Sequence, residues 1–161
     1  MTQPRVKLTV EEYTDELLTL VEPLAATGGA ETVGLGDALG RVLASDVTAV
    51  GPIPAFDNSA MDGYAVRHAD LSEGVRLEVV GDIPAGSSAN PAIGPGQCVR
   101  IMTGAPVPSD ADAVVPVEAT SAEREGESWA DAEVRIHRAV EPGANVRRLG
   151  EDVRVGDLIA R

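Results

Sequence analysis

Near the start of the chain, apolar side chains recur at intervals of three or four residues, the spacing of one face of an α-helix. The residues that follow this spacing are Val10, Tyr13, Leu17, Leu20 and Leu24. Thr9 and Glu12 stand three residues apart at the beginning of this run, which is the spacing of a capping box. The pattern therefore predicts a helix over residues 10–22, with Pro23 near its end.

The pattern is weaker in the next part of the chain. A β-branched pair, Thr32 and Val33, predicts a brief strand. The sequence DALGRVLA at 37–44 then places apolar residues four apart and predicts a second short helix. Its apolar positions are Ala38, Leu39, Val42 and Leu43. Gly40 lies inside this helix and costs it about 1 kcal/mol.

From Ser45 onward, β-branched runs alternate with clusters of Gly, Pro, Asp and Asn, a texture typical of strands joined by tight turns. The runs predict strands at 47–50, 64–67, 75–80, 97–102, 113–118 and 134–140, and a last one near Leu158. Apolar and charged side chains alternate over residues 75–79, so one face of that strand packs inward. Residues 81–96 and 121–128 are predicted loops. The expected fold class is α+β, mainly β.

The charge of the chain limits its partners. The chain has 161 residues, enough for one compact domain or for two small domains that share a core. It carries 26 acidic and 13 basic side chains, so most of its surface repels a phosphate backbone and we expect no nucleic acid partner. Screening acts over about 8 Å at physiological salt, so a local arginine pair can still hold a small anionic substrate.

Several absences narrow the class of protein. Cys98 is the single cysteine, which excludes an intramolecular disulfide, and no Cys and His cluster offers a zinc site. The first twenty residues carry four carboxylates where a signal peptide needs an apolar run, and no apolar stretch approaches eighteen residues. We therefore expect a cytoplasmic protein without a membrane segment. The sequence ends at Arg161 within a predicted strand, so we expect it to be the N-terminal region of a longer protein.

Common catalytic signatures are absent as well. The chain has no P-loop, no GxSxG and no HExxH motif. His68 and His137 have no partner at the spacing of a metal site or a catalytic triad. A self-contained hydrolase, kinase or metalloprotease is not indicated.

The first candidate for chemistry is the polar stretch DNSAMDGY at 57–64. Its Asp62-Gly63 pair is typical of a tight turn, because glycine accepts a positive φ and aspartate bonds back to its own backbone. The functional alternative is that Asp62 projects its carboxylate from a turn at the edge of a strand into a cleft. Asn58 and Ser59 would then bind a polar ligand, or they hold the loop. Local spacing alone favours the turn.

The second candidate is IMTGAPVP at 101–108, where an apolar strand ends and two prolines stiffen the exit. Thr103 offers a hydroxyl group and Gly104 an exposed amide, and both suit an oxyanion. The alternative is a turn that merely terminates the strand.

The third candidate is GANVRRLGED at 143–152. Arg147 and Arg148 are of the type that binds oxyanions through two parallel hydrogen bonds, whereas Glu151 and Asp152 offer the oxygen ligands that Mg²⁺ prefers. The alternative is a solvated loop whose charges pair with one another, worth about 0 to 1 kcal/mol.

Together, these three stretches resemble the molybdopterin molybdenumtransferase family. FDNSAMDGYAV at 56–66, RIMTGAPVP at 100–108 and GANVRRLGED at 143–152 occur in the order and spacing of the N-terminal region of that family. DALGRVLASDV at 37–47 also resembles it. The chain departs from the family pattern at residues 109–112, where Ser-Asp-Ala-Asp replaces the usual Gly-Ala-Asp.

The resemblance implies an enzyme that inserts molybdate into the dithiolene of adenylylated molybdopterin, with help from Mg²⁺ and with release of AMP. By motif position, the functional residues of the family fall on Asp62, Thr103 and Asp152. Asp62 and Asp152, with Glu151 beside them, would orient Mg²⁺ or a water, and the Thr103 hydroxyl would bond an oxyanion. The residues implied for substrate binding are Asn58, Ser59, Gly104, Arg147 and Arg148.

The resemblance also implies partners and domains. Members of the family are homodimers whose cleft is completed across subunits, and a molybdopterin adenylyltransferase acts upstream. Residues 48–140 would form a small β-barrel-like domain inserted into an elongated α/β domain made of residues 1–47 and 141–161. The later domains, which include the one that binds most of the pterin and nucleotide, are absent from these residues, so we expect the chain to be inactive alone.

A protein of a different class remains open as an alternative. The eukaryotic relatives also organise membrane receptors, so this chain could be a dimerisation or scaffold module without catalysis. A scaffold has no need for Asp62, Thr103 and Asp152 on one face of a cleft. The arrangement of these three side chains therefore separates the two hypotheses.

Overall fold

The structure is a computed structural model that describes residues 7–20, 29–122 and 132–161. The chain divides into two compact units. The larger unit comprises Thr48–Ile159, and the smaller unit comprises Met1–Val47 with Ala160–Arg161.

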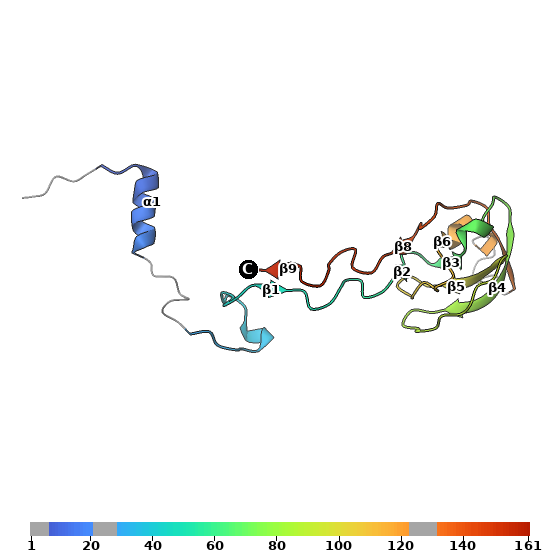
Figure 1. Ribbon diagram of the computed structural model, residues 1–161, viewed down its shortest axis with the longest axis horizontal. Helices are drawn as coiled ribbons and strands as arrows, with labels where there is room; N and C mark the ends of the chain where they lie inside the picture. Colours follow the sequence, from blue (N-terminus) through green and yellow to red (C-terminus); the bar gives the residue numbers. More distant parts are fainter. Residues whose placement is uncertain (1–6, 21–28, 123–131) are drawn as a thin grey trace, which may run out of the picture. The chain divides into compact units, whose positions relative to one another are not determined.

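The smaller unit contains α1, the helix Val10–Thr19 (Figure 1). The predicted capping box is confirmed, because the Glu12 amide donates to Thr9 Oγ1 at 3.1 Å and the Thr9 amide donates to Glu12 Oε2 at 2.8 Å. Leu20 is the C-cap, and the rest of the predicted helix and its boundary, residues 21–24, lie outside the described residues. The apolar stripe of α1 is exposed in the structure.

Two short elements predicted after α1 are wrong. Thr32 and Val33 form no strand, and residues 37–44 form no α-helix. In their place the structure has a 3₁₀ turn, η1 Leu35–Asp37. Gly40 has a φ of 79°, in the left-handed region that a right-handed helix excludes, so the backbone turns where the helix was predicted to continue.

The larger unit is built on a five-stranded sheet with the strand order β6-β3-β5-β4-β7. The strands are β3 Gly63–Val66, β4 Arg76–Ile83, β5 Gln97–Ile101, β6 Ala113–Pro116 and β7 Glu133–Arg135, with the 3₁₀ turns η2 His68–Asp70 and η3 Val117–Ala119 after β3 and β6. Neighbouring strands are antiparallel except for the parallel pair β4 and β5. The sheet curls, and a bridge between Thr120 and Ile136 joins the segments that follow its two edge strands (Figure 1).

The strands of this sheet were all predicted from the sequence. Those at 64–67, 75–80, 97–102 and 113–118 are confirmed as β3 to β6, with shifted ends. The strand predicted at 134–140 is confirmed only as β7, which is shorter. β7 ends early because the next backbone bonds go elsewhere: the His137 amide donates to the Ala119 carbonyl at 2.8 Å. The chain therefore no longer pairs with β4 beyond this point.

Both faces of the central strands are buried. Along β3, Tyr64 and Val66 belong to one apolar cluster, while Ala65 belongs to another on the opposite face. Ile93 and Ala105, which lie in the loops before and after β5, complete the second cluster. Burial on both faces explains why β3 is a continuous apolar run, whereas β4 alternates buried and exposed residues as predicted.

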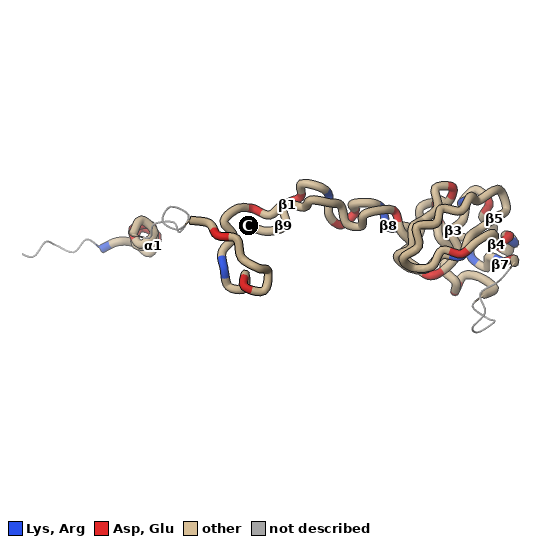
Figure 2. The backbone as a smooth tube through the Cα atoms, turned by 90° about the horizontal axis from the view of Figure 1, so that it is seen from below, with Lys and Arg blue, Asp and Glu red and all other residues tan. Residues whose placement is uncertain are grey.

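Two long segments of the larger unit, residues 49–57 and 148–157, run antiparallel beside each other, and we call them the two-stranded ribbon (Figures 1 and 2). Backbone hydrogen bonds join them, for example between Ile53 and Val153. The ribbon is flanked by the paired strands β1 Val47–Thr48 with β9 Leu158–Ala160, and β2 Asn58–Ser59 with β8 Val146–Arg147. β1 and β9 confirm the predicted strands at 47–50 and near Leu158 in shorter form, whereas β2 and β8 were not predicted.

The described residues are mainly β with the single α-helix α1, which confirms the predicted balance of the fold class. Residues 84–96 form a loop as predicted, although residues 81–83 belong to β4, and most of the predicted loop 121–128 lies outside the described residues. The division into residues 48–140 and an α/β domain from both ends stays a prediction. No helix in the described ranges has the length and apolar character to cross a membrane.

Replacing Gly63 with alanine tests the contact of β3 with β6. An added Cβ would lie 2.1 Å from the Val115 carbonyl oxygen, so the two strands would have to separate. We expect a loss of about 2–3 kcal/mol in the free energy of unfolding, measured by urea denaturation. The matched control is Gly51→Ala, whose Cβ would meet nothing within 4 Å. Equal stability of the two variants would contradict the role of this contact.

Candidate functional site

The three motifs predicted from the sequence lie side by side in the larger unit. β2, from the first motif, pairs with β8, from the third, and Asn58 is opposite Arg147. On the other side of β2 lies the second motif. There the Ser59 amide donates to the Ala105 carbonyl at 3.0 Å, and the Gly104 amide donates to the Ser59 carbonyl at 2.8 Å. The motifs therefore form three neighbouring backbone segments with β2 in the middle.

This arrangement brings Asp62 into contact with Thr103, 41 residues away in the sequence. Asp62 Oδ1 accepts two hydrogen bonds from Thr103, one from the amide and one from the hydroxyl group, each 2.7 Å long. The amide bond, followed by the hydroxyl bond, favours the charged carboxylate and lowers the pKa of Asp62 below its ordinary value. The other carboxylate oxygen, Oδ2, has no hydrogen-bond partner among the residues that the structure describes.

The Asp62–Thr103 pair presents hydrogen-bond acceptors. A threonine hydroxyl has one hydrogen, and here Asp62 takes it. The remaining capacity of the pair consists of lone pairs on Thr103 Oγ1 and Asp62 Oδ2, which suit a cation or an N–H donor. While Asp62 is charged and keeps this bond, Thr103 has no hydrogen to give to an oxyanion.

Gly63 follows Asp62 but does not form the tight turn that local spacing favours. It opens β3 and does not have a positive φ. Glycine suits this position because it has no Cβ, which would collide with the Val115 carbonyl. The Asp-Gly pair is therefore the start of a strand in close contact with β6.

Asn58 and Ser59 are buried within the cluster. Asn58 Nδ2 donates to the Phe56 carbonyl at 3.1 Å. Ser59 Oγ donates to the Met61 carbonyl at 2.6 Å and accepts from the Met61 amide at 3.3 Å. Both side chains hold the loop, which is one of the two roles expected of them, and their contact with a ligand stays a prediction.

The amide of Gly104 is not available to an oxyanion, contrary to the sequence-based expectation. It donates to the Ser59 carbonyl and so helps to fix the second motif beside β2. Gly104 has a φ of 80°, a backbone conformation that residues with a Cβ rarely adopt. The glycine therefore serves the turn after β5.

Arg147 is bonded to both acidic residues of its own motif. Its Nε donates to Glu151 Oε1 at 2.7 Å, and its Nη2 donates to Asp152 Oδ2. These bonds, with Glu151 as the larger cause, raise the pKa of Arg147. The pKa of Glu151 is lowered, first by the bond from the Arg148 amide at 2.8 Å and then by Arg147.

Arg148 is bonded to a residue that the sequence analysis gave no role. Its Nη1 donates to Asp57 Oδ2 at 2.7 Å, and the Leu149 amide donates to Asp57 Oδ1 at 2.8 Å. The Leu149 bond is the largest cause that lowers the pKa of Asp57, followed by the Arg148 bond. Asp57 and Arg148 are 91 residues apart in the sequence, so no local pattern could have indicated their contact.

Asn145 is a second position that the sequence analysis missed. It has a φ of 57°, and its Nδ2 donates to the Val114 carbonyl at 2.9 Å. Its own carbonyl accepts from the Ala60 amide at 2.9 Å. Asn145 thus ties the third motif both to β6 and to the first motif. The Gly-Ala-Asn sequence was an available signal, because asparagine tolerates left-handed turns.

The polar side chains fall into two groups. The first consists of Asp62 and Thr103, and the second consists of Asp57, Arg147, Arg148, Glu151 and Asp152. Within the described ranges, no hydrogen bond or ion pair joins one group to the other. Asp152 lies on the ribbon, where its amide donates to the Ile53 carbonyl at 3.0 Å. The structure therefore brings two of the three predicted catalytic residues together, and a cleft shared by all three stays a prediction.

The residues expected to hold Mg²⁺ meet its requirements in part. Mg²⁺ usually takes one or two carboxylates and completes its octahedron with water and substrate phosphate. Asp62 Oδ2 suits such an ion as a single ligand. Glu151 and Asp152 are bonded to Arg147, and the described part of the chain has no group of three or more His, Cys, Asp or Glu residues that could hold a metal ion. The residues do not fit an ion held by all three carboxylates.

The fold and the three paired motifs define the class of this chain: a mainly β protein of two units whose motifs meet at β2. A comparison with known families identifies the class further. The family described as "MoeA N-terminal region (domain I and II)" matches residues 8–161. The chain belongs to this family, which confirms the resemblance seen in the three motifs.

Individual relatives agree with the family match. The molybdopterin molybdenumtransferase of Bacillus subtilis (strain 168) is 42% identical over 151 residues, which cover 90% of this chain and 34% of that protein. Molybdopterin molybdenumtransferase 2 of Mycobacterium tuberculosis is 47% identical over 133 residues, which cover 80% of this chain and 31% of that protein. The chain thus spans about a third of the length of these relatives.

A solved structure also resembles this chain. The crystal structure of molybdopterin biosynthesis moeA protein from Pyrococcus horikoshii OT3 matches with a TM-score of 0.71 and 34% sequence identity. The match covers 81% of this chain and 34% of that chain. The similarity supports the mainly β fold.

Asp62→Asn tests the bond with Thr103 through its pH dependence. The pKa of Asp62 is lowered in the folded chain from 3.8, so its charged form stabilises the fold above that pH, and this contribution is lost as the pH falls through the lower folded pKa. We expect the variant to be less stable by about 1 kcal/mol at neutral pH, because a charged acceptor becomes neutral at a partly exposed site. The difference should shrink toward zero as the pH falls below the folded pKa.

Urea denaturation over a series of pH values measures this difference directly. Glu73→Gln is the control, since Glu73 is exposed and has no hydrogen bond or ion pair with any described residue. If the free energies of unfolding of wild type and Asp62→Asn differ by the same amount down to acid pH, the carboxylate charge does not strengthen the bond with Thr103.

Proposed function

We propose that this chain is the N-terminal region of an enzyme of molybdenum cofactor biosynthesis, which inserts molybdate into adenylylated molybdopterin and releases AMP. Support comes from the relatives, which carry the name molybdopterin molybdenumtransferase and share 42% and 47% of aligned residues with this chain. Because the chain spans about a third of their length, the reaction belongs to the longer protein and the chain alone is inactive.

The observation that carries the proposal is the contact of Asp62 with Thr103 inside the cluster of three motifs. A turn that only terminates a strand needs no carboxylate with an unbonded oxygen. Here the contact fixes the side chain of Asp62 and leaves Oδ2 available at a partly exposed position. A rigidly held acceptor of this kind suits a substrate N–H group or a cation.

Asp62 is the ligand that this chain offers to magnesium. When bound, the ion offsets negative charge on phosphate and molybdate oxygens. Thr103 holds Asp62 in one orientation through two bonds of 2.7 Å, so Oδ2 is presented to the ligand without a search over side-chain rotamers. Thr103 is therefore a positioning residue for Asp62.

Arg147 and Arg148 bind the anionic substrates. Each guanidinium is held by carboxylates, so an oxyanion binds by replacing them: Glu151 and Asp152 at Arg147, or Asp57 at Arg148. The side chains in these ion pairs are 36% to 54% exposed, and ion pairs open to solvent contribute little to stability, so the exchange costs little. Asp152, once released from Arg147, can accept a proton or face a cation.

Residues deeper in the cluster keep this arrangement in place. Asn58, Ser59 and Gly104 fix the backbone of the first and second motifs beside each other. The complete enzyme works as a homodimer in the cytoplasm and takes its substrate from a molybdopterin adenylyltransferase. Its remaining domains provide the other wall of the cleft.

A scaffold role is the second candidate function, and the exposure of α1 favours it. Val10 and Tyr13 are 78% and 55% exposed, although both belong to the apolar stripe of the helix. An apolar helix face of this kind is typical of a surface that binds another protein segment. The two functions are compatible in one chain, because α1 and the motif cluster belong to different units.

Asp62→Ala in the full-length protein tests the catalytic role. We expect molybdate-dependent AMP release to fall by about 100-fold or more, because an oriented charged group at the reacting centre is lost. Thr103→Ser should keep most of the activity, since serine retains the hydroxyl that bonds Asp62. Product release is measured with purified substrate, and circular dichroism confirms that each variant is folded.

Glu73→Ala serves as the control, because this exposed carboxylate lies outside the motif cluster. Undiminished turnover by folded Asp62→Ala would remove the role assigned to Asp62. AMP release by the 161-residue chain alone would show that the remaining domains are not required.

A further inference from the structure

Asp57 lies where the backbone pairing between the first and third motifs becomes irregular. The backbones of Asp57 and Ser59 bond to the second motif, so the alternate residues, Asn58 and Phe56, face the third motif in an antiparallel ladder. The register of β2 and β8 places Phe56 opposite Leu149. The Leu149 amide, however, donates to Asp57 Oδ1 at 2.8 Å, and the Phe56 carbonyl accepts from the Asn58 side chain. A side-chain carboxylate therefore takes the place of a backbone acceptor.

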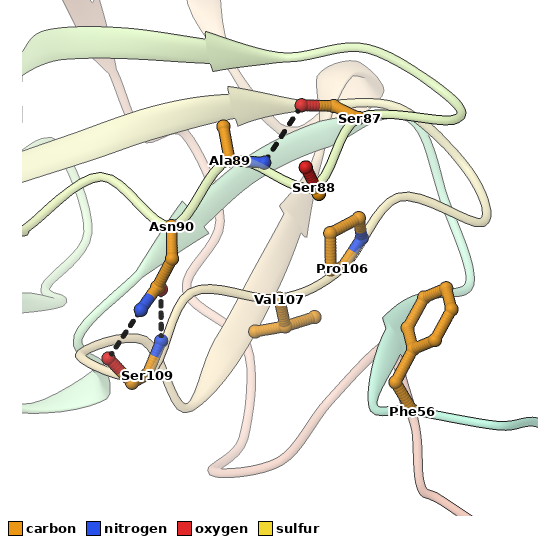
Figure 3. Close-up of a pocket in the computed structure, with 8 residues that line it drawn as sticks. All are labelled: Phe56, Ser87, Ser88, Ala89, Asn90, Pro106, Val107 and Ser109. Carbon is orange, nitrogen blue, oxygen red and sulfur yellow. Dashed lines mark hydrogen bonds between the residues drawn. The ribbon is translucent and has the colours of Figure 1, made fainter.

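The backbone of Asp57 is itself held by the second motif. The Val107 amide donates to the Asp57 carbonyl at 3.1 Å. Phe56, the preceding residue, lies at one end of a hollow whose lining includes Pro106 and Val107 (Figure 3). The carboxylate therefore projects from a backbone with fixed neighbours, which a residue that orients another group requires.

The carboxylate of Asp57 reaches a part of the third motif that has no other link to the rest of the chain. β8 pairs with β2 up to Arg147, and bonds between the two backbones resume at Gly150. Between these positions, the Arg148 amide bonds within its own motif and the Leu149 amide bonds to Asp57. Among the described residues outside the third motif, Asp57 alone is hydrogen-bonded to Arg148 or Leu149.

The two oxygens of this carboxylate have different partners. Oδ1 accepts from the Leu149 amide, and Oδ2 accepts from Arg148 Nη1 at 2.7 Å. An anion that binds Arg148 replaces Oδ2 and leaves the bond of Oδ1 intact. The Leu149 bond is also the larger cause of the lowered pKa of Asp57. The bond that anchors the backbone is therefore separate from the bond that an anion displaces.

We infer that Asp57 is a positioning residue for Arg148. Through Oδ1 it fixes the backbone that carries the guanidinium, and it continues to do so after an anion has replaced Oδ2. The inference rests on the proposed function in one respect, namely that Arg148 binds an anionic substrate. Loss of the anchor weakens the binding of substrate and transition state alike, so it raises KM and leaves kcat nearly unchanged.

Asparagine at this position separates the two bonds. Asp57→Asn keeps an acceptor for the Leu149 amide but offers no charge to Arg148, whereas Asp57→Ala removes both bonds. In full-length enzyme we expect Asp57→Ala to raise the KM for adenylylated molybdopterin about tenfold and to change kcat by less than about twofold. Asp57→Asn should stay within about twofold of wild type in both constants. Glu73→Ala, which changes an exposed carboxylate outside the motif cluster, is the control.

Exchange of the Leu149 amide hydrogen with solvent tests the anchor without the reaction. It is followed by NMR in the 161-residue chain, and thermal unfolding shows whether each variant is folded. We expect the exchange to become about tenfold faster in Asp57→Ala, because the amide loses its acceptor, and to stay close to wild type in Asp57→Asn.

A double-mutant cycle shows whether Asp57 acts through Arg148. In full-length Arg148→Ala enzyme, Asp57→Ala should not change KM further, since the group that it positions is absent. A merely structural role would lower the stability of Asp57→Ala and leave the KM of the folded enzyme unchanged.

Failure of this inference is distinguishable from failure of the proposed function. Unchanged Leu149 exchange in Asp57→Ala would overturn the inference, as would an equal rise of KM in Asp57→Asn and Asp57→Ala, or a rise that persists in the Arg148→Ala background. Unchanged KM of an active Asp57→Ala enzyme would overturn it while the proposed function stands. Faster Leu149 exchange in Asp57→Ala, with a wild-type full-length protein that releases no AMP, would support the anchor and remove the proposed function.

Discussion

β2 has two residues, yet its backbone is bonded to a neighbour on each side, to the second motif through Ser59 and to β8 through Asn58 and Ser59. Buried amides and carbonyls need partners, and both residues of β2 are buried. Loss of either neighbour would leave such groups without partners in the interior. This double pairing is what brings Asp62 to Thr103, and what places the arginines of the third motif beside Asp57. The candidate site therefore depends on the two pairings of β2.

Local neutralisation of charge is the second constraint on the site. The chain is strongly acidic, and the two arginines of the third motif are paired with the carboxylates of Asp57, Glu151 and Asp152. The ion pairs are partly exposed, so they hold the side chains in position without a large contribution to stability.

The strands of the curled sheet were predictable because each is a local property of the sequence. The run from Tyr64 to Val66 is apolar at every position because both faces of β3 are buried. Apolar and polar residues alternate along β4 because one of its faces is exposed to solvent. The capping box of α1 was predictable for the same reason, because Thr9 and Glu12 are three residues apart. The helix predicted at 37–44 failed because Gly40 adopts a left-handed φ, which a periodic pattern of apolar residues does not reveal.

The sequence by itself determined which residue types stand in the three motifs, the order of the sheet strands along the chain, and the acidic charge that disfavours nucleic acid. Tertiary structure alone decided that the motifs meet at β2, that Asp62 takes the hydroxyl hydrogen of Thr103, and that Asp57 binds Arg148 from 91 residues away. It also decided that Gly63 serves a close contact of strands rather than a turn. The physical reason is distance along the chain: periodicity and capping depend on neighbours a few residues apart, whereas hydrogen bonds between distant segments depend on the register that the folded sheet imposes.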